Sequence, residues 1–368
     1  MRPRWGRTTV KKIKININMF TYKKHILEFN KPATTSRGSM QTHTVYYIIK
    51  TDALTPKIGI GEAAPLKGLS IDAVENFEDY LQFVLTQLNN GFKQEDIDLE
   101  NWPSIQFALE TALADLKFGG DRKIFENNFI INQPIAINGL VWMNKADEMF
   151  AEAVQKIEDG FNCIKFKIGA LDFDEECRLL EKIRSRYNAF KLEIRTDANG
   201  AFANADALEK LNELKRFELH SIEQPIKAKQ LDFMQEICAK SPIAVALDEE
   251  LIGVKEKDIK PLLQFIKPPF IIIKPTLLGG LEKSNFWINK ANELGVNWWL
   301  TSALESNIGL NAIAQFCSSL NTQIPQGLGT GSLYKNNIES PLTVSKGFIH
   351  YDLNKKWDLA QIILTPES

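Results

Sequence analysis

Short apolar runs alternate with amphipathic stretches along the chain from about residue 134 onward. The apolar runs cover residues 135–141, 163–168, 192–197, 220–223, 243–248, 270–274, 297–302 and 325–328. The stretches between them carry apolar residues at helical spacing, at 144–159, 174–188, 204–217, 228–240, 255–265, 280–294 and 305–320. Regular strand–helix alternation predicts parallel strands joined by right-handed crossovers. Eight such strands predict an α/β fold, a (β/α)7β TIM-like barrel over residues 130–332.

An open, doubly wound sheet is the alternative arrangement for the same alternation. That fold carries a glycine-rich fingerprint directly after its first strand. The first apolar run here ends Asn138-Gly139-Leu140-Val141, which does not match the fingerprint. The closed barrel is therefore the favoured interpretation.

The pattern before the barrel is different and predicts an α+β capping domain over residues 10–120. Alternating or β-branched apolar residues indicate strands, and three- to four-residue apolar spacing indicates helices. The strands are expected at 10–30 and 43–50, a polar loop at 30–39, and helices at 71–89 and 103–118.

The last part of the chain, residues 333–368, lacks an eighth helical pattern. Its apolar stretches at 341–344 and 348–351 are typical of strands. We expect this tail to return to the capping domain, which would then be built from both ends of the chain.

Composition excludes several classes of protein. The 368 residues are 44% hydrophobic and 24% charged, which excludes a disordered chain. A net charge of −2 argues against nucleic-acid binding through a strong basic field. No stretch of 18 apolar residues exists, so a membrane span is not expected. The four cysteines form no CxxC motif and are interpreted as reduced thiols of a cytoplasmic protein.

Acidic residues follow three successive predicted strands. Asp197, Glu223 and Asp248 end the third, fourth and fifth strands. The carboxyl ends of barrel strands form the active-site face, so these side chains should converge there. One such residue alone would be interpreted as a helix cap or a rim ion pair. Three converging carboxylates without His or Cys predict a site for Mg²⁺, with Mn²⁺ as the alternative.

Lysines flank the acids on both sides. Lys165 and Lys167 lie two residues apart on the second strand and therefore point to the same face. Their mutual repulsion favours a depressed pKa, which suits a general base. Lys274 ends the sixth strand, beyond the acids. A metal between two cationic arms suits removal of a proton α to a carboxylate, and we predict Lys167 and Lys274 as catalytic.

These segments resemble the enolase superfamily over nearly the whole chain. The matching segments are 165–167, 195–199, 222–225, 247–249 and 273–275. The two opposed lysines resemble the muconate-lactonizing-like subgroup. Segments 274–280, 301–310 and 325–331 are similar to the o-succinylbenzoate synthase family, whose dehydratases serve menaquinone biosynthesis. Related dipeptide epimerases are expected to carry Asp-x-Asp on the last strand, which here reads Gln326-Gly327-Leu328-Gly329.

The resemblance implies a syn-dehydration of a cyclohexadiene carboxylate that bears a succinyl arm. In that mechanism Lys167 removes the ring proton α to the carboxylate and returns it to the departing hydroxyl. Asp197, Glu223 and Asp248 would hold the metal that binds the carboxylate. Lys274 would stay cationic over the ring.

Further residues are expected near the substrate or behind the site. Substrate contacts are expected from Lys165, Arg195, Ser302, Ser306 and Gly327, although helix capping is an equal alternative for either serine. Four further residues are expected either behind the metal-binding carboxylates or in a lid over the substrate: Asn199, Glu249, Arg37 and Ser39. The expected partner is a small carboxylate substrate, and a homo-oligomer is left open.

Two other functions compete with this interpretation. An N-acylamino-acid racemase or a dipeptide epimerase would use the same two lysines as opposed bases on an α-carbon. A non-catalytic binding protein with a barrel fold is disfavoured, because binding alone does not need paired lysines around three carboxylates.

Overall fold

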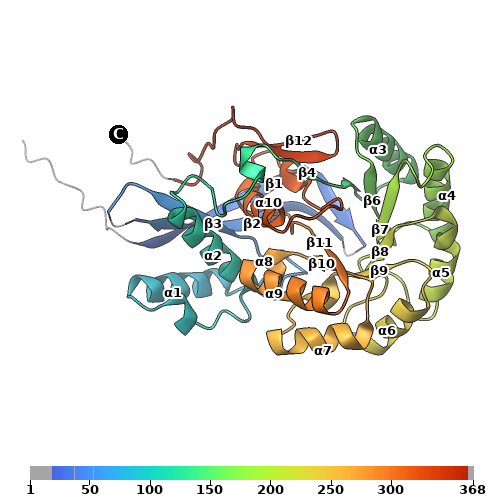
Figure 1. Ribbon diagram of the computed structural model, residues 1–368, viewed down its shortest axis with the longest axis horizontal. Coiled ribbons are helices and arrows are strands. Elements are labelled where there is room, and N and C mark those ends of the chain that lie inside the picture. Colours follow the sequence, from blue (N-terminus) through green and yellow to red (C-terminus); the bar gives the residue numbers. More distant parts are fainter. Residues whose placement is uncertain (1–18, 37, 53, 364–368) are drawn as a thin grey trace, which may run out of the picture.

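The computed structural model describes residues 19–36, 38–52 and 54–363. Figure 1 shows a barrel half on the right and a cap half on the left, with the N-terminal strands running between them. The predictions for residues 10–18 and 364–368, and the lid candidate Arg37, lie outside the described residues.

The barrel half is a curled parallel sheet covered by helices. Its seven strands follow the order β11-β10-β9-β8-β7-β6-β5. The strands are β5 (Gly139–Val141), β6 (Cys163–Lys167), β7 (Glu193–Asp197), β8 (Ser221–Glu223), β9 (Val245–Leu247), β10 (Phe270–Ile273) and β11 (Asn297–Leu300). The covering helices are α3 (Ala146–Glu158), α4 (Phe173–Arg184), α5 (Ala207–Leu214), α6 (Leu231–Lys240), α7 (Glu256–Ile266), α9 (Gly280–Glu293) and α10 (Asn307–Ser319). The predicted α/β barrel is confirmed.

The eighth strand expected at 325–328 is reduced to two bridges. Gln326 bridges Ile137 and Gly327 bridges Thr301, both in parallel. These two bridges connect the sheet's first and last strands through one short segment. A side chain at Gly327 would not fit, because its Cβ would lie 2.5 Å from Thr301 Oγ1. Glycine at this position therefore allows the segment to lie close against Thr301 at the cavity.

The cap half is a three-stranded antiparallel sheet with two helices. It contains β1 (Phe20–Thr35), β2 (Gly38–Thr51), β3 (Ile58–Ala63), α1 (Phe77–Asn89) and α2 (Pro103–Lys117). Helix α2 packs directly on β3 at glycines. A Cβ at Gly61 would lie 1.9 Å from the Ala108 carbonyl oxygen. The backbone of the cap sheet is thus in direct contact with the backbone of helix α2.

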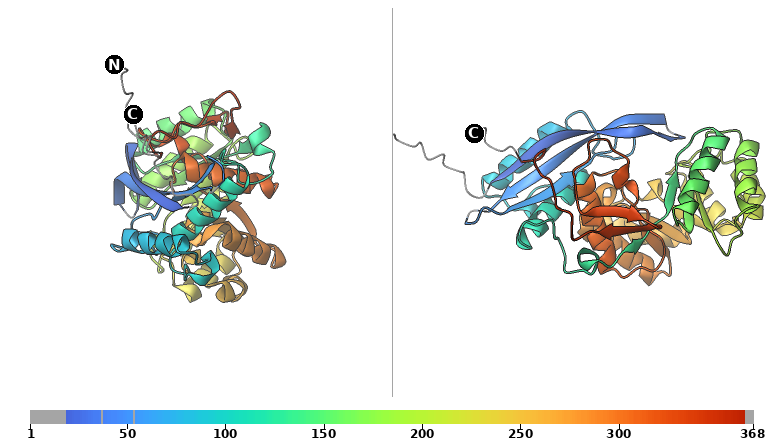
Figure 2. Two further views of the ribbon diagram at one scale, coloured as in Figure 1. Left: turned by 90° about the vertical axis from the view of Figure 1, so that its left-hand side faces the viewer. Right: turned by 90° about the horizontal axis from the view of Figure 1, so that it is seen from above.

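The prediction of a polar loop at 30–39 is wrong. Strand β1 continues to Thr35 and β2 begins at Gly38, with a register shift between Glu28 and Ala33. The polar side chains of this segment are exposed or half-buried, so its composition resembles that of a loop while its backbone stays largely paired. Figure 2 shows the long hairpin reaching over the barrel. At its tip, Ser36 Oγ donates to the Ala198 carbonyl oxygen at 3.0 Å.

The tail after residue 333 contacts both halves. Strand β13 (Phe348–Tyr351) pairs with β12 (Leu342–Ser345) on one side and with β4 (Ile135–Ala136) on the other, and neither tail strand joins the cap sheet. Other tail residues pack against β1 and β2 in one apolar cluster. Its tail members include Tyr334, Ile338 and Ile362.

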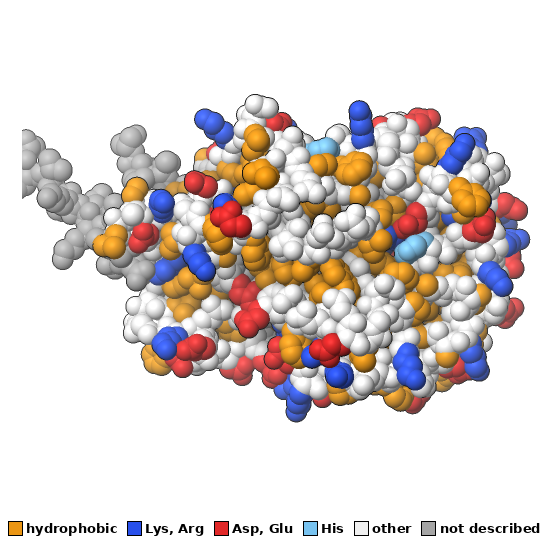
Figure 3. All heavy atoms as spheres, in the orientation of Figure 1, with side chains coloured by type: hydrophobic (Ala, Val, Ile, Leu, Met, Phe, Trp, Pro, Cys, Tyr) orange, Lys and Arg blue, Asp and Glu red, His pale blue; other side chains and the backbone are white. Residues whose placement is uncertain are grey.

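The surface carries mixed charge. Basic and acidic side chains lie beside one another around the face shown in Figure 3. Across the described part of the chain, each helix is too short or too polar to cross a bilayer. The four cysteines are free thiols.

Candidate active site

The predicted chemistry lies at the carboxyl ends of adjacent strands. Parallel pairing sets Lys167 opposite Asp197, and Asp197 opposite Glu223. Asp248 follows β9 and Lys274 follows β10 directly. The structure therefore brings together both lysine arms and all three acids at one end of the sheet, as their spacing predicts.

Three buried ammonium groups pair with three buried carboxylates. Lys165 Nζ contacts Asp197 Oδ2 at 2.7 Å and also pairs with Glu223 Oε2. Lys167 Nζ lies 2.5 Å from the same Asp197 oxygen. Lys274 Nζ lies 2.5 Å from Asp248 Oδ2 and 3.8 Å from Glu223 Oε1. The three formal positive charges balance the three negative charges, which lowers the desolvation penalty of burying the cluster.

The two catalytic candidates differ in their electrostatics. Burial lowers the pKa of Lys167, and the charges of Lys165 and Lys274 lower it further against the opposing effect of Asp197. Burial also disfavours the charged Lys274, but Asp248 and Glu223 outweigh it and raise the pKa of that lysine. Lys167 is thus the readier proton acceptor, and Lys274 is the more firmly held cation.

The acids respond to the same fields. Burial raises the pKa of Asp197, but Lys165, Lys167 and Lys274 override it and hold that pKa well below its ordinary value. Burial and the neighbouring Asp197 charge raise the pKa of Glu223. The two carboxyl groups therefore differ, and Asp197 is more firmly ionised than Glu223.

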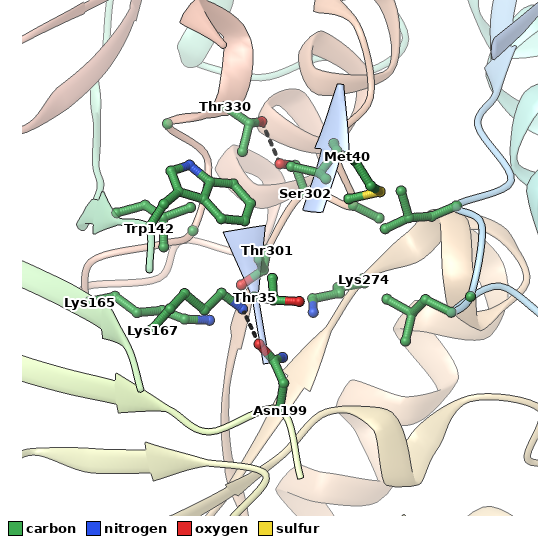
Figure 4. Close-up of a pocket in the computed structure, with 18 of the residues that line it drawn as sticks. Thr35, Met40, Trp142, Lys165, Lys167, Asn199, Lys274, Thr301, Ser302 and Thr330 are labelled. Carbon is green, nitrogen blue, oxygen red and sulfur yellow. Dashed lines mark hydrogen bonds between the residues drawn. The ribbon is translucent and has the colours of Figure 1, made fainter. Parts of the chain in front are cut away.

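A cavity of about 430 Å³ lies over this cluster, between barrel and cap. Lys165 and Lys167 approach it from one side and Lys274 from the other (Figure 4). Thr35 and Met40 close it from the cap hairpin. A volume of this size suits a small organic ligand enclosed on most sides.

Several predicted residues lie around this cavity. Lys165, Ser302, Gly327, Asn199 and Ser39 line it. Asn199 Oδ1 accepts from Lys167 Nζ at 3.0 Å (Figure 4), and its Nδ2 donates to Glu249 Oε1 at 3.0 Å. Glu249 therefore orients the amide that contacts Lys167.

Two predicted substrate contacts lie elsewhere. Ser306 is fully buried behind the cavity wall, where its Oγ donates to Glu62 at 2.6 Å and caps α10. Arg195 lies inside the barrel, where it pairs with Glu193 and covers the Trp299 ring. These positions favour a structural role for both side chains.

Sequence reasoning missed other lining residues. Trp142 follows β5, and Thr330 Oγ1 lies 2.5 Å from Ser302 Oγ (Figure 4). Leu66 and Leu69 enter from the cap. The signal for Trp142 was its position directly after a predicted strand. The apolar cap residues carried no signal, because only the docking of the two halves exposes them to the cavity.

The three carboxylates at the strand ends are the candidate ligands for a metal ion. As they stand, no three carboxylate, imidazole or thiolate groups of residues 19–36, 38–52 and 54–363 are arranged to hold one. Lys165 Nζ lies between the Asp197 and Glu223 carboxylates instead. The chemistry nevertheless fits a hard cation, since the donors are oxygens from three adjacent strands. Glu223 Oε1 is buried and accepts no hydrogen bond among the described residues.

Comparisons with known proteins agree with this geometry. Residues 148–355 match the family described as enolase C-terminal domain-like. The chain is 40% identical over 362 residues to the o-succinylbenzoate synthase of Desulfotalea psychrophila, covering 89% of this chain and 98% of that protein. It is 24% identical to the Haemophilus influenzae o-succinylbenzoate synthase, covering 76% and 80% of the two chains.

Solved structures show the same fold. The crystal structure of MenC from Desulfotalea psychrophila matches with a TM-score of 0.78 and 37% identity, over 90% of this chain and 99% of that one. The L-Ala-D/L-Glu epimerase from Bacillus subtilis matches with a TM-score of 0.78 at 21% identity, over 94% and 98%. The chain belongs to the enolase superfamily and, more narrowly, to the family of o-succinylbenzoate synthases.

Proposed function

We propose that this protein dehydrates 2-succinyl-6-hydroxy-2,4-cyclohexadiene-1-carboxylate to o-succinylbenzoate, a step of menaquinone biosynthesis. One observation carries the proposal. Lys167 and Lys274 face the same cavity from opposite sides of a carboxylate cluster, in a chain 40% identical to an o-succinylbenzoate synthase over 98% of that enzyme. The protein is accordingly a hydro-lyase.

Lys167 is the base in this proposal. Its neutral Nζ removes the ring proton α to the substrate carboxylate, and the electron pair moves into the carboxylate system. The resulting ammonium then gives the proton to the hydroxyl on the same face, which departs as water as the ring becomes aromatic. Support comes from the lowered pKa of Lys167 and from its position on the cavity wall. Asn199 holds the amine in place through its Oδ1.

Lys274 stays protonated and faces the ring from the opposite side. Its raised pKa and its contact with Asp248 support this role. A fixed cation stabilises the negative charge that develops on the substrate as the proton leaves. Lys165 contributes a second positive charge beside Lys167.

Asp197, Glu223 and Asp248 would hold Mg²⁺. When bound, Mg²⁺ neutralises charge that develops on the substrate carboxylate. Charge counting supports the pairing of metal and substrate. A divalent cation and a substrate with two carboxylates carry equal and opposite charges, so their joint binding leaves the net charge of the lysine–carboxylate cluster unchanged. Burial tolerates a group of charges best when they compensate one another.

Three of the other predicted residues enclose the substrate in this proposal. We assign Ser302 and Gly327 to its contacts and Ser39 to the lid, because all three line the cavity. Among the described residues, we assign those of 10–120 to the cap and 130–332 to the barrel, and we assign the tail to the cap through Tyr334, Ile338 and Ile362. The free thiols fit a cytoplasmic location.

Ultraviolet absorbance tests the reaction directly. Purified protein, the cyclohexadiene substrate and Mg²⁺ are expected to give the aromatic product, and excess EDTA is expected to stop the conversion. A protein that leaves the substrate unchanged in Mg²⁺ would contradict the proposal. Manganese in place of magnesium then tests the choice of metal.

Racemisation of an N-acylamino acid is the second candidate. The placement of Lys167 and Lys274 on opposite sides of the cavity favours it, because two opposed bases can exchange an α-proton from either face. Incubation of an N-succinylamino acid in D₂O tests it. Deuterium at the α-carbon would support racemisation, and its absence alongside dehydration would leave the first proposal alone.

A further inference from the structure

A second buried carboxylate group lies behind the cavity wall, apart from the lysine–carboxylate cluster. Glu305 is fully buried between β11 and α10. The residue before it, Leu304, has φ 68°, a left-handed conformation that is costly for a branched side chain. Such a backbone persists only where its surroundings fix it, so the inward position of Glu305 is strongly specified.

The Glu305 carboxylate ties together the ends of two barrel strands. Its Oε1 accepts from Thr276 Oγ1 at 2.5 Å, and its Oε2 accepts from the Ala303 backbone N–H at 2.7 Å. Thr276 belongs to the single helical turn α8 (Pro275–Leu278), which follows β10. Ala303 follows β11 and lines the cavity.

Lys274 begins the turn that Glu305 anchors. It is the capping residue of α8, and its carbonyl oxygen accepts from Leu277 N at 2.9 Å and Leu278 N at 3.0 Å. Thr276 is two residues further on and fully buried. Fixing the Thr276 hydroxyl therefore fixes the backbone from which the Lys274 side chain enters the cavity.

The cap holds the same wall from behind. Glu62 of β3 accepts from Ser306 N at 2.7 Å and from Gly309 N at 2.7 Å. A Cβ at Gly309 would lie 2.7 Å from Glu305 Cβ and 3.1 Å from Glu62 Oε2. Among the described residues, neither glutamate has an ion pair with Lys or Arg. Their hydrogen bonds to backbone and hydroxyl donors therefore hold this wall.

We propose that Glu305 is a positioning residue for Lys274, acting through Thr276 and the α8 turn. The proposal rests on the proposed function, because it concerns the part that Lys274 plays in that reaction. Glu305 itself does not line the cavity. Its loss is expected to lower turnover by misplacing Lys274 and to leave substrate binding nearly intact.

Paired threonine variants test this role. Thr276→Val keeps the shape of the side chain and removes the donor to Glu305, and it is expected to lower kcat about tenfold with KM within about twofold. Thr276→Ser restores a hydroxyl and is expected to recover most of the activity. Thr111→Val is the matched control, because Thr111 is a buried threonine of α2 that donates to the Phe107 carbonyl oxygen at 2.8 Å, away from the cavity. It is expected to leave kcat unchanged.

Crystal structures decide where the effect originates. In Thr276→Val, Lys274 Nζ is expected to move away from Asp248 Oδ2, while Lys167 keeps its place. A loss of kcat with Lys274 unmoved, an unchanged kcat, or a tenfold rise of KM alone would overturn the proposal. If Thr276→Val does not fold, Thr276→Ala, which also removes the hydroxyl donor to Glu305, gives the same readings. A wild-type protein without turnover refutes the proposed function instead, and the position of Lys274 in the variant still tests the positioning role.

Discussion

Replacing Glu62 by Gln is expected to change how the stability of the protein depends on pH. Burial raises the pKa of Glu62 from 4.5 to about 7, and the nearby Glu305 charge adds to the rise against the hydrogen bonds from Ser306 and Gly309. Tyr47 and Tyr334 are the other titratable groups around it. The folded protein therefore binds the Glu62 proton more tightly than the unfolded chain does.

The sign and size follow from that difference in pKa. Because the folded-state pKa is the higher one, the contribution of Glu62 is full below about pH 4.5 and is lost as the pH rises through about 7. At about 1.4 kcal/mol for each tenfold change in acidity, the whole effect is about 3 kcal/mol. Between pH 5.5 and 8.5 we expect about 2 kcal/mol of it.

Urea unfolding at several pH values measures the effect. The wild-type free energy of unfolding minus that of Glu62→Gln is expected to fall by about 2 kcal/mol from pH 5.5 to 8.5. Other buried acids with a raised pKa, such as Asp72 and Glu176, occur in both proteins and cancel. Ser306→Ala removes a donor to the ionised form and should move the fall to higher pH. A difference that is flat or grows with pH would refute the reasoning.

Three further outcomes are expected. Lys167→Ala should lower kcat at least about a thousandfold while calorimetry still detects binding of o-succinylbenzoate with Mg²⁺, and retention of full turnover would exclude Lys167 as the base. Gly61→Ala should lower the free energy of unfolding, measured with urea, by about 3 kcal/mol, because the new Cβ would lie 1.9 Å from the Ala108 carbonyl oxygen. A decrease below about 0.5 kcal/mol would show that α2 can shift away. Ser36→Ala should raise KM severalfold in the absorbance assay with kcat unchanged, because the hairpin tip loses its bond to Ala198; an unchanged KM would show that this bond does not hold the lid.

The barrel and its reactive rim could be predicted because they depend on local periodicity. Apolar runs that each end in a charged residue recur at the spacing of one βα unit. This pattern places Lys167, Asp197 and Lys274 at one end of a parallel sheet. Parallel pairing of the strands then brings these side chains close together. No knowledge of distant contacts was needed for these residues.

The parts that escaped prediction depend on contacts between distant segments. Ser306 is a plausible substrate donor in the sequence, but its hydroxyl is taken by Glu62, 244 residues earlier. The hairpin through residues 30–39 has loop composition, because its polar side chains face solvent or the cavity while its backbone remains largely paired. Nothing local marks Glu305 as buried, since only the surrounding fold removes it from water.

The pairing of the first strand with the tail has a consequence for biosynthesis on the ribosome. Asn30 N donates to the Leu333 carbonyl oxygen at 2.7 Å, and Lys335 N donates to the Glu28 carbonyl oxygen at 2.8 Å. The N-terminal hairpin therefore emerges first but finds its last partners only after more than 300 further residues have been translated. During that interval the outer edge of β1 is open to other strands. We expect nascent chains truncated before residue 333 to depend on chaperones more than the full-length protein does.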